Sequence, residues 1–159
     1  VESYRKLAML PSPKKEKIEL TTLTENCLQI MKPLFKKEAI EIKNNIDFNR
    51  WILVDPNQME QVFINLLTNS MFALQDKENK EITISAEHKE KRLYINITDT
   101  GNGIESEIED KIFLPFFTTR KEGAGIGLTL SKNIVEAHGG YLAFKSDENK
   151  TLFTVCLVE

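Results

Sequence analysis

Apolar residues recur along this chain with two periods, and each period predicts a different kind of element. A spacing of three and four residues, which gives a helix one apolar face, runs through residues 20–38, 56–74 and 127–138. Strict alternation of apolar and polar residues, or a short apolar run between turn residues, is typical of a strand. Six strands are predicted on this basis, at residues 41–46, 51–54, 81–88, 92–98, 141–146 and 151–157.

The second of the three helices has a clear start in the sequence. Asp55 is a favoured N-cap residue, Pro56 suits the first helical position, and Gln58 stands where a capping box requires Glu or Gln. We therefore expect the side chains of Asp55 and Gln58 to bind each other's backbone N–H groups. Pro33 lies inside the first helix, where proline favours a kink.

The order of the elements predicts the fold class. Helices and strands follow one another without the regular strand–helix–strand repetition of a parallel sheet. We expect an α+β fold, a two-layer sandwich in which the helices cover one face of a mixed, mostly antiparallel sheet. Residues 1–17 end in a Pro-Ser-Pro and lysine-rich run, and we interpret them as the tail of an upstream helix and a linker. Residues 18–159 then form one domain.

Composition and charge narrow the classes of function. The net charge is −3, and Lys and Arg are dispersed among acidic residues, so no basic face for nucleic acid is expected. No apolar run is long enough to span a bilayer and no signal peptide is present, which predicts a cytoplasmic piece and leaves open whether its parent protein is anchored in the plasma membrane. Cys27 and Cys156 lack metal-site spacing and are expected to be reduced core residues.

Two asparagines on the second helix form the first candidate site. Asn65 and Asn69 are four residues apart, so they lie one above the other at the edge of the apolar stripe. Amide oxygens beside the phosphates of a nucleotide suit Mg²⁺, which prefers oxygen ligands and keeps several waters. A pair of solvent-facing amides explains the same spacing equally simply.

The segment after the fourth predicted strand forms the second candidate site. Asp99 continues the inward-facing parity of that strand, so its carboxylate is expected to be buried and to need a donor such as the exocyclic amine of adenine. Gly101 and Gly103 would let the backbone turn and approach a ligand closely. An ordinary turn after a strand is the other interpretation.

Glycines before the third helix form the last candidate site. Gly123, Gly125 and Gly127 lead directly into the helix, where exposed N–H groups and the helix dipole favour phosphate. A long loop precedes them instead of a strand, which argues against a dinucleotide-binding fingerprint. That loop carries Arg120 and Lys121, which either reach phosphates or form a solvated basic pair.

The motifs stand in a characteristic order: Asn-x-x-x-Asn, Asp-x-Gly-x-Gly, Phe-x-Pro-Phe-Phe (residues 113–117) and Gly-x-Gly-x-Gly-Leu. This order resembles the N, G1, F and G2 boxes of the histidine kinase branch of the GHKL ATPases, over residues 20–157. The resemblance implies a Bergerat-type ATP-binding fold with ATP and Mg²⁺ as ligands. It implies that Asn69 is the main Mg²⁺ ligand with Asn65 in support, and that Asp99 binds adenine.

The resemblance also implies the remaining nucleotide-binding residues. They are Gly101, Gly103, Ile104, Thr118, Thr119, Arg120, Lys121, Gly123, Gly125, Ile126, Gly127, Leu128 and Thr151. Thr151 departs from the family pattern in its neighbour, because Lys150 stands where a glycine is usual.

The implied function is that of the catalytic domain of a two-component sensor histidine kinase, which transfers the γ-phosphoryl of ATP to a histidine on a separate dimerisation domain. Neither His88 nor His138 stands in an acceptor context, so autophosphorylation of this chain is not expected and no catalytic residue is assigned. The implied partners are that dimerisation domain and, through the full-length protein, a response regulator; the chain itself is expected to be monomeric.

Two other functions remain open at this point. The first is a GHKL ATPase that hydrolyses ATP to drive a conformational change, but such enzymes carry a glutamate where Asn65 stands, and an amide cannot activate water. The second is a nucleotide-gated binding module without phosphotransfer. Phosphorylation of a separate histidine-containing domain would distinguish a kinase from both.

Overall fold

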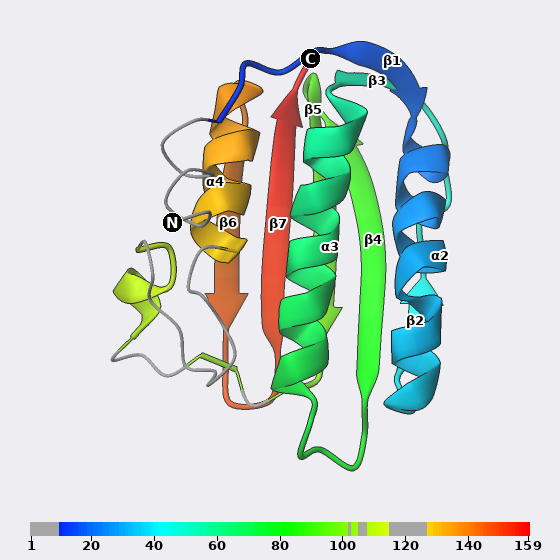
Figure 1. Ribbon diagram of the computed structural model, residues 1–159, viewed down its shortest axis with the longest axis vertical. Helices are drawn as coiled ribbons and strands as arrows, with labels where there is room; N and C mark the ends of the chain where they lie inside the picture. Colours follow the sequence, from blue (N-terminus) through cyan, green and yellow to red (C-terminus); the bar gives the residue numbers. More distant parts are fainter. Residues whose placement is uncertain (1–9, 102, 105–107, 115–126) are drawn as a thin grey trace.

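The computed structural model describes residues 10–101, 103–104, 108–114 and 127–159 (Figure 1). Its helices are α2 (Leu20–Lys37), α3 (Pro56–Ala73) and α4 (Gly127–Ala137), with a short 3-10 helix at Glu109–Lys111. Its strands are β1 (Glu16–Glu19), β2 (Glu41–Asn44), β3 (Trp51–Val54), β4 (Glu81–Lys89), β5 (Arg92–Asp99), β6 (Tyr141–Ser146) and β7 (Thr151–Val158).

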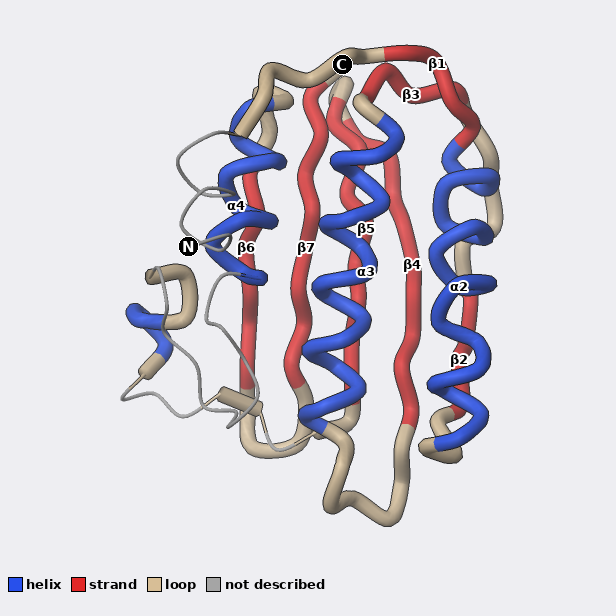
Figure 2. The backbone as a smooth tube through the Cα atoms, in the orientation of Figure 1, coloured by secondary structure: helices blue, strands red, loops and turns tan. Residues whose placement is uncertain are grey.

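The helices lie side by side over one face of a five-stranded sheet (Figure 2). The strand order is β2-β4-β5-β7-β6, in which β2 pairs with β4 in parallel and every other neighbouring pair is antiparallel. The predicted α+β sandwich with a mostly antiparallel sheet is therefore confirmed. Both predicted hairpins, β4–β5 and β6–β7, are present.

A small ribbon of two strands was not predicted as such. β1 pairs with β3 in antiparallel register, from Glu16 opposite Val54 to Glu19 opposite Trp51. β1 thus begins within residues 1–17, the segment that the sequence pattern indicates as the tail of an upstream helix and a linker. The sequence pattern does not predict this strand, because only Ile18 among its four residues is apolar. Its partner strand, β3, lies more than 30 residues away in the sequence.

The core forms where α3 crosses the centre of the sheet. Leu93, Ile95 and Ile97 of β5 are buried completely or almost completely, as their two-residue period predicts. Met59 and Leu66 of α3 are also fully buried and belong to the same cluster. The middle helix and the middle strands therefore carry most of the packing.

The apolar stripe of α2 is narrower than the sequence pattern indicates. Leu23, Cys27 and Met31 are buried, but Ile30 and Leu34 are 52% and 44% exposed. α2 lies at the end of the helical layer, so it has a neighbouring helix on one side only (Figure 1). Pro33 does not interrupt the helix.

Both cysteines are free and buried, as expected. Burial raises the pKa of the Cys27 thiol to about 12, and the nearby Glu60 carboxylate adds to this effect. The thiol therefore stays protonated and unreactive at neutral pH. None of the described helices combines the length and the apolarity that a membrane span requires.

The start of α3 is capped differently from the predicted capping box. The Asp55 carboxylate accepts a hydrogen bond from the Gln58 N–H at 3.1 Å, so the predicted N-cap is confirmed. The reciprocal bond is absent, because the Asp55 N–H donates to Nε2 of His138 at 3.0 Å and the Gln58 amide donates to the Pro11 carbonyl at 2.9 Å. The predicted bond from the Asp55 N–H to the Gln58 side chain is therefore wrong, because His138, which is distant in sequence, accepts that N–H.

His138 fastens the end of α4 to the start of α3. Its Nδ1–H donates to the Ile134 carbonyl at 2.8 Å, which leaves Nε2 free to accept from Asp55. The second carboxylate oxygen of Asp55 accepts the Lys14 N–H at 2.9 Å. Burial alone would raise the pKa of Asp55, but the N–H groups of Lys14 and Gln58 outweigh it and hold the pKa below its usual value. The segment entering the domain, α3 and α4 thus meet at one buried cluster.

We expect His138→Ala to lower the free energy of unfolding by about 2 kcal/mol, because it leaves the buried Asp55 N–H without an acceptor. Urea denaturation at neutral pH measures this change. His88→Ala is the control, because the only hydrogen bond or ion pair of the His88 ring with the described residues is to the partly exposed Glu159 carboxylate. It should change stability by less than about 0.5 kcal/mol. Equal losses in the two variants would contradict the role given to His138.

Candidate functional site

One end of the sheet carries a row of polar side chains that face the helices. Asp99 ends β5, directly opposite Thr151 of β7, which in turn lies opposite Ser146 of β6. Residues paired in this way point to the same face of the sheet. Asp99 and Thr151 are only 2% and 4% exposed, so the expectation that the Asp99 carboxylate points inward is confirmed.

The Asp99 carboxylate has few polar neighbours for a buried charge. Oδ1 accepts the Gly101 N–H at 3.0 Å. Burial raises the pKa of Asp99, and the Gly101 N–H and the Ser70 hydroxyl oppose that rise only in part. Ser70 Oγ lies near the carboxylate but does not meet hydrogen-bond geometry with any described residue. Within the described part of the chain no Lys, Arg or His forms an ion pair with Asp99.

At each of the two glycines after Asp99, a side chain would clash with a different neighbour. A Cβ on Gly101 would lie 2.9 Å from both the Ala73 carbonyl oxygen and the Asp99 carboxylate. Gly103 has a φ of +76°, and a Cβ there would collide with the Asp147 backbone. These glycines therefore allow the chain to turn between the end of α3 and the β6–β7 hairpin.

The next residue is tied to the same hairpin. The Ile104 N–H donates to Ser146 Oγ, and the Ile104 side chain packs against the core. The segment after β5 is thus held on both sides of the Asp99 carboxylate, by α3 and by β6.

Asn65 connects the middle of α3 with the start of α4. Asn65 Nδ2 donates to the Gly127 carbonyl and to Ser131 Oγ, each at 3.3 Å. Asn69 lies one turn further along α3 and is half-buried, and Ala73, which contacts Gly101, lies one turn beyond it. Asn65, Asn69 and Ala73 form one edge of α3 that spans about 12 Å from the first turn of α4 to the Asp99 segment.

The described residues leave the start of α4 loosely packed around Gly127. The nearest described atom to a Cβ on Gly127 would be Asn65 Cγ at 3.9 Å, an ordinary contact. Gly127 therefore fulfils no steric need set by the described residues. Leu128, the next residue, is half-buried and packs against the core.

The loop between the 3-10 helix and α4 is described only as far as Leu114. Phe113 packs edge-on against Phe144 of β6, with ring centroids 5.9 Å apart, and its carbonyl accepts the Thr129 hydroxyl at 2.6 Å. The beginning of the loop is thus attached to α4 and β6. Several predicted site residues lie outside the described residues: Thr118, Thr119, Arg120, Lys121, Gly123, Gly125 and Ile126.

The donor set fits a magnesium ion bound together with a nucleotide. Among the described residues no group of three His, Cys, Asp or Glu side chains could hold a metal. Asn65 and Asn69 offer amide oxygens on one edge of α3, and Mg²⁺ usually takes only one or two protein ligands and completes its shell with phosphates and water. The residues present therefore suit a metal that arrives with phosphates.

Sequence reasoning missed the neighbours that complete the site. Ser70 lies beside Asp99, Ser131 accepts from Asn65, and Ser146 holds the backbone of Ile104. Serines of this kind carry no distinct pattern in sequence. Only Ser146 could have been found, because the predicted hairpin of residues 141–146 and 151–157 places it opposite Thr151.

The fold and this site define a nucleotide-binding α+β domain, and comparison with known proteins identifies its family. Residues 54–159 match the family model of histidine kinase-, DNA gyrase B- and HSP90-like ATPases, and the chain belongs to this family. It is 34% identical over 142 residues to the sensor histidine kinase ZraS of Escherichia coli K12, which covers 88% of this chain and 30% of ZraS.

Further relatives agree with this assignment. The C4-dicarboxylate transport sensor protein DctB of Rhizobium meliloti is 36% identical over 100 residues, 63% of this chain and 16% of DctB. The nucleotide-free catalytic domain of the histidine kinase ThkA superposes with a TM-score of 0.81 and 27% identity, covering 91% of this chain and 95% of that domain. The chain thus spans less than a third of ZraS, and its described fold is that of a histidine kinase catalytic domain.

We expect Asp99→Asn to increase the free energy of unfolding at pH 7. The raised pKa means that folding favours the protonated carboxyl, so this contribution to stability is fully present below the unfolded-state pKa and is lost as the pH rises through the folded-state value. Asparagine carries no charge and keeps an acceptor for the Gly101 N–H. Urea denaturation between pH 7 and pH 4 should show a gain over wild type that narrows toward the acid end.

Asp76→Asn is the control for the loss of one negative charge, because Asp76 is exposed in the turn after α3. It should leave stability within about 0.5 kcal/mol of wild type at both pH values. A wild-type protein that is more stable than the Asp99→Asn variant at pH 7 would contradict the account of Asp99 as a destabilising buried charge.

Proposed function

We propose that this chain is the catalytic domain of a sensor histidine kinase, which binds Mg-ATP and transfers the γ-phosphoryl group to a histidine on a separate dimerisation domain. The observation that carries the proposal is the buried Asp99 carboxylate, which forms no ion pair with any described residue and lies at one end of an α3 edge whose other end meets the first turn of α4. Membership of the ATPase family and the likeness to ZraS and DctB support it.

Asp99 would recognise the adenine base. A buried carboxylate without a cationic partner favours a donor from the ligand, and the exocyclic amine of adenine is such a donor. Gly101 and Gly103 would admit the base close to the backbone, and Ile104 would contribute an apolar wall. Thr151, directly opposite Asp99, has its hydroxyl on the same face and would assist through a water.

The asparagine edge of α3 would hold the metal and lead to the phosphates. Asn69 would supply the main oxygen ligand, and Asn65 would support the metal through its amide oxygen, because its nitrogen already faces α4. Mg²⁺, when bound, would neutralise phosphate charge.

The phosphates would lie at the N-terminus of α4. Backbone N–H groups from Gly127 and Leu128 would bind them, as helix N-termini bind anions. Thr118, Thr119, Arg120, Lys121, Gly123, Gly125 and Ile126 would complete the binding surface.

The contribution of these residues to the reaction is positional. Phosphoryl transfer needs the nucleotide to be held with its γ-phosphoryl group in line with the attacking atom, and it needs charge neutralisation. Asp99 and the α3 edge would fix the two ends of ATP relative to each other. We assign no general base to this chain; an acidic neighbour of the acceptor histidine in the partner domain would take the proton.

The parent protein would act in a two-component system. ZraS and DctB are sensor proteins by name, and ThkA has been crystallised with the response regulator TrrA. The proposed partners of this chain are accordingly the dimerisation domain that supplies the histidine and, downstream, a response regulator.

Asp99→Asn is expected to reduce ATP affinity by at least about 100-fold, because a site built around one hydrogen bond to the base leaves a buried polar group mismatched when that bond is lost. Isothermal titration calorimetry with ATP and Mg²⁺ measures the change, and circular dichroism confirms that the variant is folded. The control, Asp76→Asn, should bind like wild type. Unchanged affinity in Asp99→Asn would refute the assignment of Asp99 to adenine.

Asn69→Ala is expected to remove most of the difference between the ATP affinities measured with and without Mg²⁺. Because the amide would contact the metal and not the base, affinity for metal-free ATP should change by less than about threefold. Thr68→Ala, one position earlier on the same helix, should leave the Mg²⁺ dependence intact. An Asn69→Ala protein with the Mg²⁺ dependence of wild type would exclude Asn69 as the main ligand.

Phosphotransfer is tested by mixing the chain with radiolabelled Mg-ATP and a separately purified, histidine-containing dimerisation domain of a cognate kinase. Acid-labile label on that domain, absent when its histidine is replaced, is the expected result. Release of inorganic phosphate with no labelled partner would favour the ATPase alternative. Tight ATP binding without either product would favour a nucleotide-gated module.

A further inference from the structure

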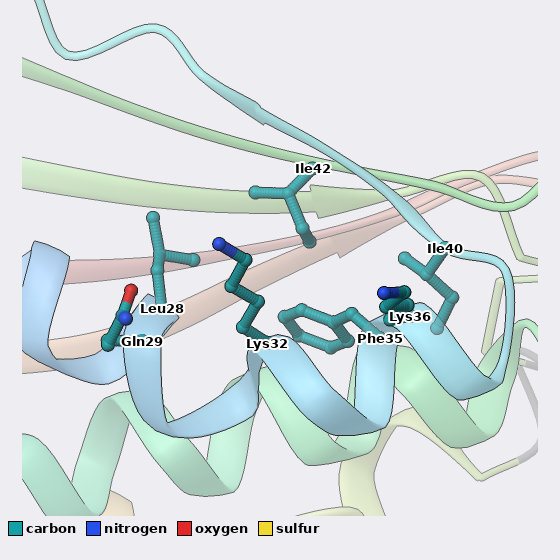
Figure 3. A pocket seen from close by; sticks show the side chains of 7 residues that line it. All are labelled: Leu28, Gln29, Lys32, Phe35, Lys36, Ile40 and Ile42. Atoms are coloured by element: carbon teal, nitrogen blue, oxygen red, sulfur yellow. The ribbon is translucent and has the colours of Figure 1, made fainter.

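A groove separate from the nucleotide site lies between α2 and the edge strand β2 (Figure 3). Its volume is about 430 Å³, within the range of small-molecule sites. The lining residues come from α2, from β2 and from the turn between them: Leu28, Gln29, Lys32, Phe35, Lys36, Ile40 and Ile42. None of these residues belongs to α3, α4 or β5, the elements that carry the nucleotide site.

The groove exists because β2 provides too few side chains to fill the space beside α2. β2 has four residues and contributes Ile42 alone to the lining, whereas α2 extends over 18 residues. α2 also packs against α3, where the Cys27 thiol contacts the Glu60 carbonyl oxygen at 4.0 Å. β2 is an edge strand of the sheet, and the groove lies between it and α2.

The floor of the groove is apolar. Phe35 and Ile40 belong to the hydrophobic core and are 3% and 9% exposed, and they present that remaining surface here. Leu28 and Ile42 are half-buried and pack against the same core. A ligand with an aliphatic body would bury apolar surface on these four side chains without disturbing the packing beneath them.

Two cationic side chains stand at the rim. Lys32 and Lys36 are one helical turn apart on the same edge of α2, so their Cβ atoms are about 6 Å apart. In Figure 3 the Lys32 side chain extends from α2 toward β2. Neither ammonium forms an ion pair with a carboxylate of the described residues, whereas the nearby Lys43 is paired with Glu81 at 3.2 Å.

None of the described residues that line the groove is acidic, so Lys32 and Lys36 give its rim a positive charge above an apolar floor. Two ammonium groups one turn apart can share a single oxyanion, and the apolar floor below them suits an aliphatic chain attached to it.

We propose that this groove binds an amphiphilic organic anion, with its aliphatic body on Leu28, Phe35 and Ile42 and its carboxylate between Lys32 and Lys36. The ligand class is a medium-chain carboxylic acid. Because the rim is exposed to solvent, the affinity is modest and falls as salt screens the two ammonium groups.

Decanoate is the probe, and decyltrimethylammonium, with the same chain and the opposite charge, is the matched control. Both are added below their micellar concentrations to the nitrogen-labelled 159-residue chain, and amide NMR shifts are followed. We expect decanoate to shift the amides of residues 28–42 in a saturable manner and to raise the melting temperature, since it binds the folded state. Equal shifts with both probes, or decanoate shifts centred elsewhere, would overturn the proposal.

Charge variants of α2 test the rim. Lys32→Glu should weaken decanoate binding by at least about fivefold, because it replaces an attractive exposed charge contact with a repulsive one. Lys37→Glu is the matched control, because Lys37 lies in the last turn of the same helix beside Lys36 but does not line the groove. It should bind decanoate like wild type, and an equal weakening by Lys37→Glu would show that only the general charge of the helix matters.

Two further measurements separate the groove from other sites and other occupants. Asp99→Asn should leave decanoate binding unchanged, and a changed decanoate affinity in that variant would place the probe in the nucleotide site. An acetylated peptide of alternating aspartate and valine is titrated in parallel, because β2 is an open sheet edge that could pair with an extended chain. Binding of this peptide with no binding of decanoate would replace the proposed ligand by an acidic peptide.

Discussion

The packing of α3 across the middle of the sheet is the constraint on which the rest of this structure depends. Met59, Leu66 and Leu67 are fully buried against the central strands, so neither the position nor the rotation of α3 can change without opening the core. That rotation determines which residues occupy the edge facing α4. Asn65 and Asn69 stand on this edge because the apolar residues between them are committed to the core.

A second consequence is that stability and the proposed function conflict at Asp99. The strand parity that buries Leu93, Ile95 and Ile97 also buries the carboxylate, and its few polar neighbours do not compensate for the lost hydration. A domain selected for stability alone would place an uncharged residue there. The buried charge, at one end of the α3 edge that leads to the first turn of α4, is the strongest physical argument for a ligand that supplies a donor.

The helices are held together by more than apolar packing. The cluster of Asp55, Gln58 and His138 ties the start of α3 to the end of α4 and to the segment that enters the domain. Asn65 ties the same two helices at the other end of α4. The phosphate end of the proposed site is therefore connected through α4 to the chain that would link this domain to its partner. The α2–β2 groove lies outside this connection, at the opposite edge of the helical layer.

The sequence by itself determined the type and order of most elements, the inward direction of Asp99 and the stacking of Asn65 on Asn69, because these follow from periods of two and 3.6 residues that act within one element. It also indicated the family, through four motifs in order. The tertiary structure alone decided the pairing of β1 with β3, the use of His138 in place of Gln58 at the Asp55 N–H, and the exposure of Ile30 and Leu34. Each of these depends on a neighbour distant in sequence, and local periodicity contains no information about which distant segment comes to lie alongside.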